Sequence, residues 1–359
     1  MAADPPSPPH LGLRDRRAPA TEHSKEPSMP HYDLSADELA AYRPQLPRPD
    51  DLRQFWEGTF DEAAAWPLHA AFSAVDTGLT VIDTYDTRFT GAGGATIRAW
   101  LHLPANRSTA PLPTVVEYVG YGGGRGLPHE RHLWAAAGYA HLVVDTRGQG
   151  SAWSVGHTPD PAPDGGQPAY PGFATRGIEH RDTYYYRRVY TDAVRAVQAA
   201  RAHPAVDRQR VAVAGSSQGG GIALAVSALA DDIWAVMADV PFLCHFRRGA
   251  SITDREPYAE IARYLRVHRD REHQVFSTLA YFDAAALVTD SAAPALFSVA
   301  LMDQVCPPST VYAAYNHYRG PKQIRAYPFN EHEGGEGHHQ IQQLRWLADR
   351  AADTPLRQV

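Results

Sequence analysis

Residues 215–219 read Gly-Ser-Ser-Gln-Gly, which fits the pattern G-x-S-x-G. The apolar run Val211–Ala214 comes directly before them, and a helix-like stretch follows. At a nucleophile elbow the chain turns so tightly from strand to helix that only small residues fit beside the serine. The serine hydroxyl then lies at a helix N-terminus, where N–H groups favour negative charge. The same pattern also occurs in plain Gly/Ser turns, but this context favours Ser217 as a nucleophile.

A serine hydroxyl becomes reactive when a histidine accepts its proton and a carboxylate orients that histidine. In folds with a nucleophile elbow, the catalytic residues follow one another along the chain in the order Ser, then Asp or Glu, then His. Asp303 follows the apolar run Ala295–Ala300, and His332 follows a strand expected at 323–329. We therefore predict a Ser217–Asp303–His332 triad at the strand ends; the alternative for Asp303 is an ordinary loop aspartate.

An acyl-transfer intermediate carries a negative oxygen that needs two positioned donors. The Gln218 N–H is the first candidate, because it follows the nucleophile. The second is the Tyr121 N–H in the glycine-rich loop 120–124. That loop could also be a simple turn or a phosphate loop, but it lacks the P-loop Lys and Ser/Thr, and the G-x-G-x-x-G spacing fails at Arg125.

A metal site at His332, His338 and His339 is the competing interpretation of the last loop. The segment His-Glu-Gly-Gly-Glu at 332–336 lacks the second histidine of H-E-x-x-H, so we predict no metal at these residues.

Short apolar runs alternating with helical stretches predict an α/β fold with a mostly parallel sheet and helices on both faces. An antiparallel hairpin, 81–89 and 97–103, is expected at the sheet edge. The remaining strands are expected at Thr114–Val119, His141–Asp145, Val211–Ala214, Val236–Val240, Ala295–Ala300 and 323–329. The helices are expected from Asp50 onward and at 128–137, 182–201, 218–229, 257–268, 308–318 and 338–351.

Three segments do not follow this alternation of strands and helices. Residues 1–30 have the composition of a disordered leader, before a single domain at 31–359; whether 1–28 are native is left open. Residues 147–180 predict a long irregular loop at a strand end. Residues 242–290 predict a helical insertion after the sixth strand, acting as a lid or an oligomer contact.

Composition excludes several classes of protein. A net charge of -6 over 359 residues argues against a nucleic-acid partner. The two cysteines, Cys244 and Cys306, are too few for a disulfide framework and are expected to pack in the core. No apolar stretch is long enough for a membrane helix, and no secretory signal is evident, so a cytoplasmic protein is expected.

The motifs resemble one family closely. Arg147-Gly148-Gln149, the 215–219 segment and His332-Glu333 are similar to the three signatures of carbohydrate esterase family seven, the acetyl xylan esterases and cephalosporin-C deacetylases. Segments 118–126, 257–265 and 303–310 resemble the family too.

The resemblance covers about residue 31 to the end. It implies the α/β-hydrolase fold, the same triad, and Tyr121 and Gln218 as oxyanion donors. It also implies deacetylation of xylooligosaccharides, acetylated sugars and cephalosporin C by a cytoplasmic, cofactor-free hexamer.

Arg147, Gln149 and Glu333 are predicted to shape the site. A buried Arg147 guanidinium could brace several loop carbonyls. Loop shaping and direct substrate contact stay open for Arg147 and Gln149, whereas Glu333 is expected to be structural.

Two other functions compete with an esterase. The triad alone does not separate an ester from an amide, so an amidase or peptidase on the same fold is the enzymatic alternative. A non-catalytic binding module would lack a triad member, and none is missing. Acyl size is not readable from the sequence; Phe242 and the insertion are candidate pocket walls.

Overall fold

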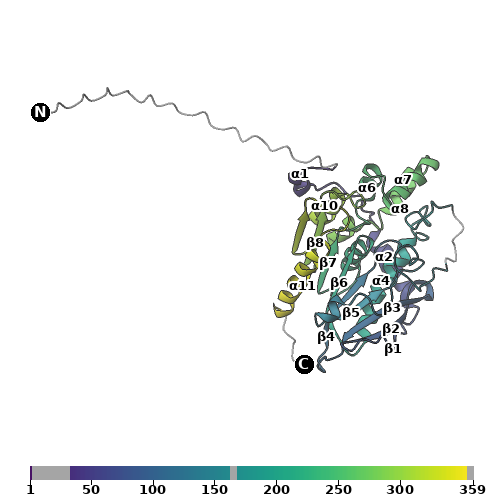
Figure 1. Cartoon of the computed structure of the whole chain (residues 1–359). Coiled ribbons are helices and arrows are strands. Elements are labelled where there is room, and N and C mark those ends of the chain that lie inside the picture. The colour runs from purple at the N-terminus through teal and green to yellow at the C-terminus, as the bar shows by residue number, and fades with distance from the viewer. Residues whose placement is uncertain (2–32, 162–167, 354–359) are drawn as a thin grey trace. The chain divides into compact units, whose positions relative to one another are not determined.

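A nine-stranded sheet forms the centre of the computed structural model, which describes Met1 and residues 33–161 and 168–353 (Figure 1). Its strand order is β1-β2-β3-β5-β4-β6-β7-β8-β9. The first three strands pair antiparallel with one another, and β3 also pairs antiparallel with β5, whereas β5, β4 and β6 to β9 are mutually parallel. The strands are β1 Ala71–Val75, β2 Ile82–Thr90, β3 Thr96–Pro104, β4 Leu112–Tyr118, β5 Ala140–Val144, β6 Val206–Ser216, β7 Ala235–Asp239, β8 Ala295–Ala300 and β9 Lys322–Tyr327.

Helices cover both faces of the sheet (Figure 1). Alternate residues of β6 pack on opposite sides. Val211 and Val213 join a large cluster with α4 (Tyr185–Ala202) and α5 (Gln218–Leu229), whereas Ala212 and Ala214 join a second cluster with α3 (Leu133–Ala136) and α11 (Glu336–Asp353). Both faces of β6 are therefore buried over Val211–Ala214, as this continuous apolar run predicts. The helices are α1 Ala36–Ala41, α2 Leu52–Ala64, α3 Leu133–Ala136, α4 Tyr185–Ala202, α5 Gln218–Leu229, α6 Phe246–Ile252, α7 Tyr258–Val267, α8 Glu272–Leu279, α9 Ala284–Leu287, α10 Pro308–His317 and α11 Glu336–Asp353, with 3-10 turns η1 Ala92–Gly94 and η2 Val288–Asp290.

The predicted α/β fold with a mostly parallel sheet is confirmed, and the edge hairpin is β2 and β3. The helix expected at 128–137 is wrong in extent, because only Leu133–Ala136 is helical. Arg131 has a φ of 58°, a left-handed conformation that a right-handed helix cannot include. Strand β1 was not predicted, so the strand before the insertion, expected as the sixth, is β7.

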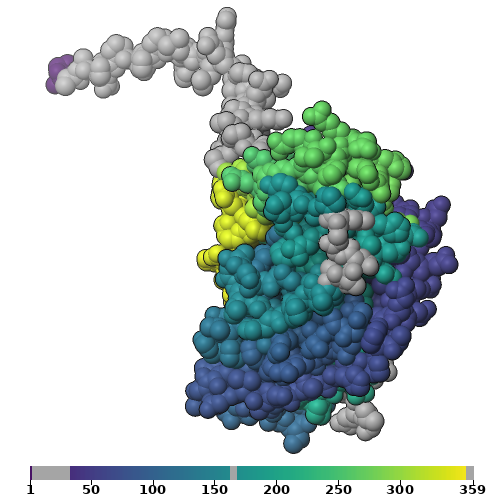
Figure 2. Space-filling model, turned by 90° about the vertical axis from the view of Figure 1, so that its right-hand side faces the viewer, coloured from purple at the N-terminus to yellow at the C-terminus, as the bar shows by residue number. Residues whose placement is uncertain are grey.

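Two long connections follow the carboxyl ends of parallel strands, one after β5 and one after β7. Between β5 and α4 the described residues form no helix or strand, as predicted for 147–180. The insertion contains α6 to α9 between β7 and β8. In Figure 2 its green residues lie beside teal residues of the middle of the chain.

The chain divides into two units, Met1–His31 and Tyr32–Val359, and the second contains the sheet. The predicted disordered leader, 1–30, lies outside the described residues except for Met1, so it stays a prediction. Among the described residues, no helix has the length and apolarity to span a membrane.

Candidate active site

Ser217 lies at a strained turn between β6 and α5. Its φ of 56° and ψ of −119° are uncommon for a residue with a side chain. Three backbone hydrogen bonds hold the turn: the Ser217 N–H donates to Asp239 O at 2.9 Å, and the Ser217 carbonyl accepts from Phe242 N at 2.9 Å and Gly221 N at 3.0 Å. A Cβ on Gly219 would lie 2.0 Å from the Tyr118 carbonyl oxygen, so the helix start approaches β4 too closely for a side chain. The elbow geometry predicted for 215–219 is present.

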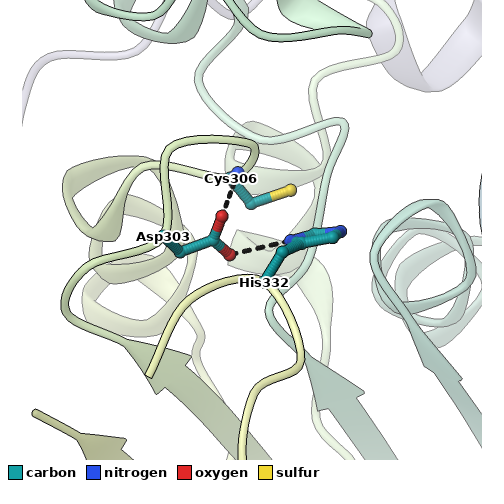
Figure 3. A group of neighbouring side chains, drawn as sticks. All are labelled: Asp303, Cys306 and His332. Atoms are coloured by element: carbon teal, nitrogen blue, oxygen red, sulfur yellow. Dashed lines mark hydrogen bonds and ion pairs between the residues drawn. The ribbon is translucent and has the colours of Figure 1, made fainter. Parts of the chain in front are cut away.

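Asp303 and His332 form a hydrogen-bonded pair although they lie on different loops (Figure 3). Asp303 Oδ2 is 2.8 Å from His332 Nδ1, and Asp303 Oδ1 accepts from the N–H groups of Val305 and Cys306 at 2.8 and 2.9 Å. The Asp303 side chain is fully buried, so its two oxygens are fixed by these donors. In Figure 3 the second ring nitrogen of His332 points away from Asp303. This arrangement leaves Nε2 as the ring nitrogen that can accept a proton.

Asp303, Cys306 and His332 also offer one potential metal-ligand atom each, all within 4.8 Å of one another (Figure 3). Burial, with the nearby Asp303 and Cys244, raises the pKa of the Cys306 thiol well above its usual value, and the Ser217 hydroxyl lowers it only in part. A metal needs the thiolate, and both Asp303 oxygens already accept hydrogen bonds. The three residues therefore fit an oriented histidine better than a metal centre.

The alternative histidine set is not assembled as a site. His339 is buried between the Tyr327 hydroxyl, 2.9 Å from Nδ1, and an Asp239 oxygen, 3.0 Å from Nε2, whereas His338 is exposed. The second of these contacts has the distance of an ion pair but not the angle of a hydrogen bond.

A cavity of about 380 Å³ opens at the carboxyl ends of the strands. Ser217 and His332 both line it, and Tyr121 lies on its wall as well. No hydrogen bond joins Ser217 to His332 within the described residues, but both side chains face the same space. The lining residues come from the end of β4 and the segment after it, the loop after β5, the elbow after β6, the insertion, and the loops after β8 and β9. They are Glu117, Tyr118, Gly120, Tyr121, Arg131, Trp153, Ser216, Ser217, Glu256, Pro257, Val305 and His332.

The backbone N–H groups of Tyr121 and Gln218 have no acceptor within the described part of the chain. Gln218 begins α5, so its N–H has no partner within the helix. The two donors predicted for a developing oxyanion thus lie at the elbow and on the cavity wall.

Gln149 links the two segments that carry these donors. Its Nε2 donates to Gln218 Oε1 at 2.9 Å, and its Oε1 accepts from Gln218 Nε2 at 3.1 Å. The same Oε1 accepts from the N–H of Gly122, beside Tyr121, at 2.7 Å. Gln149 is buried and does not line the cavity, so its contacts fit loop shaping rather than substrate contact.

Family membership follows from a comparison of the whole sequence. Residues 29–350 match the model of a family described as acetyl xylan esterase (AXE1). The chain belongs to this family. The resemblance to acetyl xylan esterases stated from the three motifs is therefore confirmed.

Two solved acetyl xylan esterases have the same fold over almost their whole length. The enzyme from Paenibacillus sp. R4 is 38% identical, with a TM-score of 0.83 over 88% of this chain and 99% of that one. Acetyl xylan esterase 1 from Thermoanaerobacterium sp. JW/SL YS485 is 30% identical, with a TM-score of 0.81 over 89% and 99%.

A curated relative is longer than this chain. Acetyl esterase Axe7A of Xylanibacter ruminicola is 25% identical over 304 residues, which span 81% of this chain and 65% of that protein. An acylaminoacyl peptidase of Pyrococcus horikoshii, 15% identical with a TM-score of 0.55 over 75% of this chain and 41% of that one, shares the fold alone.

Within this family member, Arg147 and Glu333 lie away from the cavity. Arg147 is buried and donates from Nε and Nη2 to Asp192 at 2.5 and 2.7 Å. It also reaches Asp160 and one carbonyl, that of Ala92. The expectation that it braces several loop carbonyls is wrong, because carboxylates are its main partners. Glu333 is exposed and accepts hydrogen bonds from Asn330 and the Glu331 N–H within its own loop.

Four other residues at or near the site escaped the sequence analysis. Trp153, Arg131 and Glu117 line the cavity, and Glu260 hydrogen-bonds to Tyr121. Glu260 lies in the segment 257–265 that resembles the family, but no short motif gives any of the four a role, so only their spatial position relates them to the site. Phe242, a candidate pocket wall, is fully buried and packs against Tyr121 behind the lining, whereas the insertion does contribute Glu256 and Pro257.

Proposed function

We propose that this protein is a serine esterase that removes acetyl groups from acetylated xylooligosaccharides, other acetylated sugars and cephalosporin C. One observation carries the proposal: Ser217, at a strained elbow, lines the same cavity as His332, whose Nδ1 is held by buried Asp303. Membership of the acetyl xylan esterase family supports the choice of acetyl esters over other acyl substrates.

In the proposed mechanism, Ser217 Oγ attacks the acetyl carbonyl carbon while His332 Nε2 accepts the hydroxyl proton. Resting enzymes often lack this hydrogen bond, and it forms when substrate binds. The carbonyl oxygen becomes an oxyanion held by the N–H groups of Tyr121 and Gln218. The intermediate collapses to an acetyl-enzyme, and the sugar oxygen leaves with the proton from His332. Water then attacks the acetyl-enzyme by the same steps, releasing acetate and restoring Ser217.

Asp303 acts on the histidine in this scheme. Its carboxylate accepts from Nδ1, which sets the tautomer with Nε2 unprotonated and stabilises the charged ring after proton transfer. The backbone N–H groups of Val305 and Cys306 keep the carboxylate oriented.

Recognition of a sugar is supported by the cavity wall. Trp153 is 58% exposed and presents an indole to the cavity, beside the charged side chains of Arg131, Glu117 and Glu256. An apolar face with a few polar groups is a common design for orienting a small ligand. Oligomerisation as a hexamer, a cytoplasmic location and a covering role of the insertion over the site are further proposals; family resemblance supports the first two, and Glu256 and Pro257 at the cavity support the third.

The test is a series of initial rates for p-nitrophenyl esters from acetyl to octanoyl, with acetylated xylooligosaccharide and cephalosporin C measured alongside. We expect the highest kcat/KM for acetyl and release of acetate from both natural-type substrates. A matched acetanilide tests the amidase alternative. Faster cleavage of the anilide, or a maximum at octanoyl, would contradict the proposal.

A further inference from the structure

A buried carboxyl group lies directly behind the proposed oxyanion hole. Glu260 is on α7 of the insertion, is 2% exposed and does not line the cavity. Its Oε1 accepts a hydrogen bond from the Tyr121 hydroxyl at 2.6 Å, and its Oε2 accepts from the Ala174 N–H at 2.9 Å. Glu260 therefore joins three segments: the insertion, the loop before α4 and the loop after β4.

The Tyr121 phenol is held on every side. Its hydroxyl accepts from the N–H groups of Phe173 and Ala174 at 2.5 and 3.1 Å while it donates to Glu260. Its ring packs edge-on against Phe173 and Phe242, with centroids 5.5 and 6.0 Å away. These contacts restrict movement of the ring.

The backbone of the loop before α4 also fits closely around the carboxyl group. Gly172 has a φ of 139°, and a Cβ there would lie 2.2 Å from Glu260 Oε1. A side chain at 172 would therefore displace the Glu260 carboxylate from Tyr121. The glycine at this position thus permits the Glu260–Tyr121 hydrogen bond.

The main chain of Tyr121 is held as firmly as its ring. The Tyr121 carbonyl accepts from Trp153 Nε1 at 2.8 Å, and the next N–H, of Gly122, donates to Gln149. Its own N–H has no acceptor among the described residues and faces the substrate in the proposed mechanism. Because the ring and this N–H share one residue, fixing the ring limits rotation of the peptide that carries the donor.

The geometry points to Glu260 as a positioning residue for the oxyanion hole, acting through the Tyr121 side chain. This inference rests on the proposed function, since it assumes that the Tyr121 N–H stabilises an oxyanion. The insertion then contributes to catalysis, because Glu260 on α7 orients the Tyr121 N–H, which lies on a different loop.

The electrostatics of the pair agree with a specific contact. Burial raises the pKa of Glu260 to about 7, while the hydrogen bonds from Tyr121, Ala174 and Phe173 and the charge of Arg176 act in the opposite direction. A buried carboxyl is costly to ionise, and donors aimed at it offset that cost. A neutral glutamine retains one acceptor for the Tyr121 hydroxyl but places an NH₂ group against the Ala174 N–H.

The experiment compares Glu260→Ala, Glu260→Gln, Tyr121→Phe and the Tyr121→Phe/Glu260→Ala double variant with the wild-type protein on p-nitrophenyl acetate. Each rate is divided by the concentration of reactive serine, measured as the burst of p-nitrophenol from diethyl p-nitrophenyl phosphate. Glu272→Ala, which removes an exposed glutamate of the same insertion, is the matched control.

We expect kcat per titrated serine to fall about 10-fold or more in Glu260→Ala and Tyr121→Phe with little change in KM, because a donor used only in the transition state is misaligned. Glu260→Gln should recover part of the loss, and the double variant should be no slower than the slower single variant. If Glu260→Ala does not fold, Glu260→Gln and Tyr121→Phe decide by the same criteria.

Unchanged kcat per titrated serine in the Glu260 variants, or losses that multiply in the double variant, would overturn the inference. That outcome is distinct from failure of the proposed function, in which the wild-type protein itself would not hydrolyse acetyl esters.

Discussion

The side-chain amides of Gln149 and Gln218 face each other through two hydrogen bonds, 2.9 and 3.1 Å long, although the residues lie 69 positions apart. Gln218 follows the proposed nucleophile, and Gln149 also holds the N–H next to Tyr121. One amide pair therefore sets the spacing between the two N–H groups proposed to bind the oxyanion.

Replacing Gln149 with Ala should lower kcat about 10-fold or more with a small effect on KM. The variant leaves the Gly122 N–H and the Gln218 amide without their partner. Each lost hydrogen bond should raise the free energy of the correctly positioned donors by about 1 kcal/mol, and this raises the activation barrier. Rates on p-nitrophenyl acetate check this, with Gln209→Ala, an exposed glutamine, as the control. A Gln149→Ala enzyme with wild-type kcat would refute this role of the amide pair.

Replacing Asp303 with Asn should lower kcat about 10³- to 10⁴-fold while leaving the fold intact. The amide can still accept from the N–H groups of Val305 and Cys306, but its NH₂ group faces His332 Nδ1 and favours the wrong tautomer. The control is Asp254→Asn, whose side chain is 94% exposed. A loss below about 10-fold would show that Asp303 does not orient the base.

Replacing Trp153 with Ala should raise KM for acetylated xylooligosaccharide more than KM for p-nitrophenyl acetate, because the indole forms a cavity wall that a sugar covers. Both Trp153→Ala and Trp153→Phe lose the hydrogen bond to the Tyr121 carbonyl, so the two variants should share the same change in kcat. Trp153→Phe keeps a flat ring, so its KM should resemble that of the wild type. Val155→Ala, at a neighbouring exposed residue, is the control. Equal KM changes for both substrates would argue against sugar contact.

Acid should destabilise the protein partly through Glu117. Burial alone would raise its pKa, but the hydrogen bond with His141 and the charge of Arg131 lower it to about 2 from an ordinary 4.5. A lowered carboxyl pKa stabilises the folded state above about pH 4.5, and this contribution is lost as pH falls toward 2. It amounts to at most about 3 kcal/mol.

Urea denaturation of the wild type and Glu117→Gln at pH 7, 5, 4 and 3 checks this. The variant should be less stable at pH 7, and the gap should close toward pH 3. Glu57→Gln, which removes an exposed i,i+4 ion pair, should change little at any pH. A gap that is constant with pH would contradict the assignment to Glu117.

Local patterns explain what the sequence predicts well. The expected bounds of β8 and α5 match the structure, because a fully buried apolar run and a glycine-flanked serine are short-range signals. Strand β1 was missed because Ala71–Val75 is an edge strand without buried residues, so it lacks the apolar alternation of a covered strand.

Long-range contacts explain what the sequence does not reveal. Tyr121 and Glu260 are 139 positions apart, and nothing near either residue indicates that they meet. By contrast, the five residues 215–219 are enough to predict the elbow and its nucleophilic serine. The candidate triad could be proposed because its members follow strands whose ends must gather at one edge, whereas the residues that orient it depend on how loops pack.

The most direct test of the account is the identity of the residue that becomes acetylated. The enzyme is mixed with excess p-nitrophenyl acetate, quenched in acid within the first turnovers, digested and analysed by peptide mass spectrometry, with Ser217→Ala treated in parallel. The account predicts one acetyl group on Ser217 in the wild type, and in the variant no acetylated active-site peptide and a rate lower by several orders of magnitude. Near-normal turnover by Ser217→Ala, or a turnover-dependent acetyl group on another residue, would contradict it.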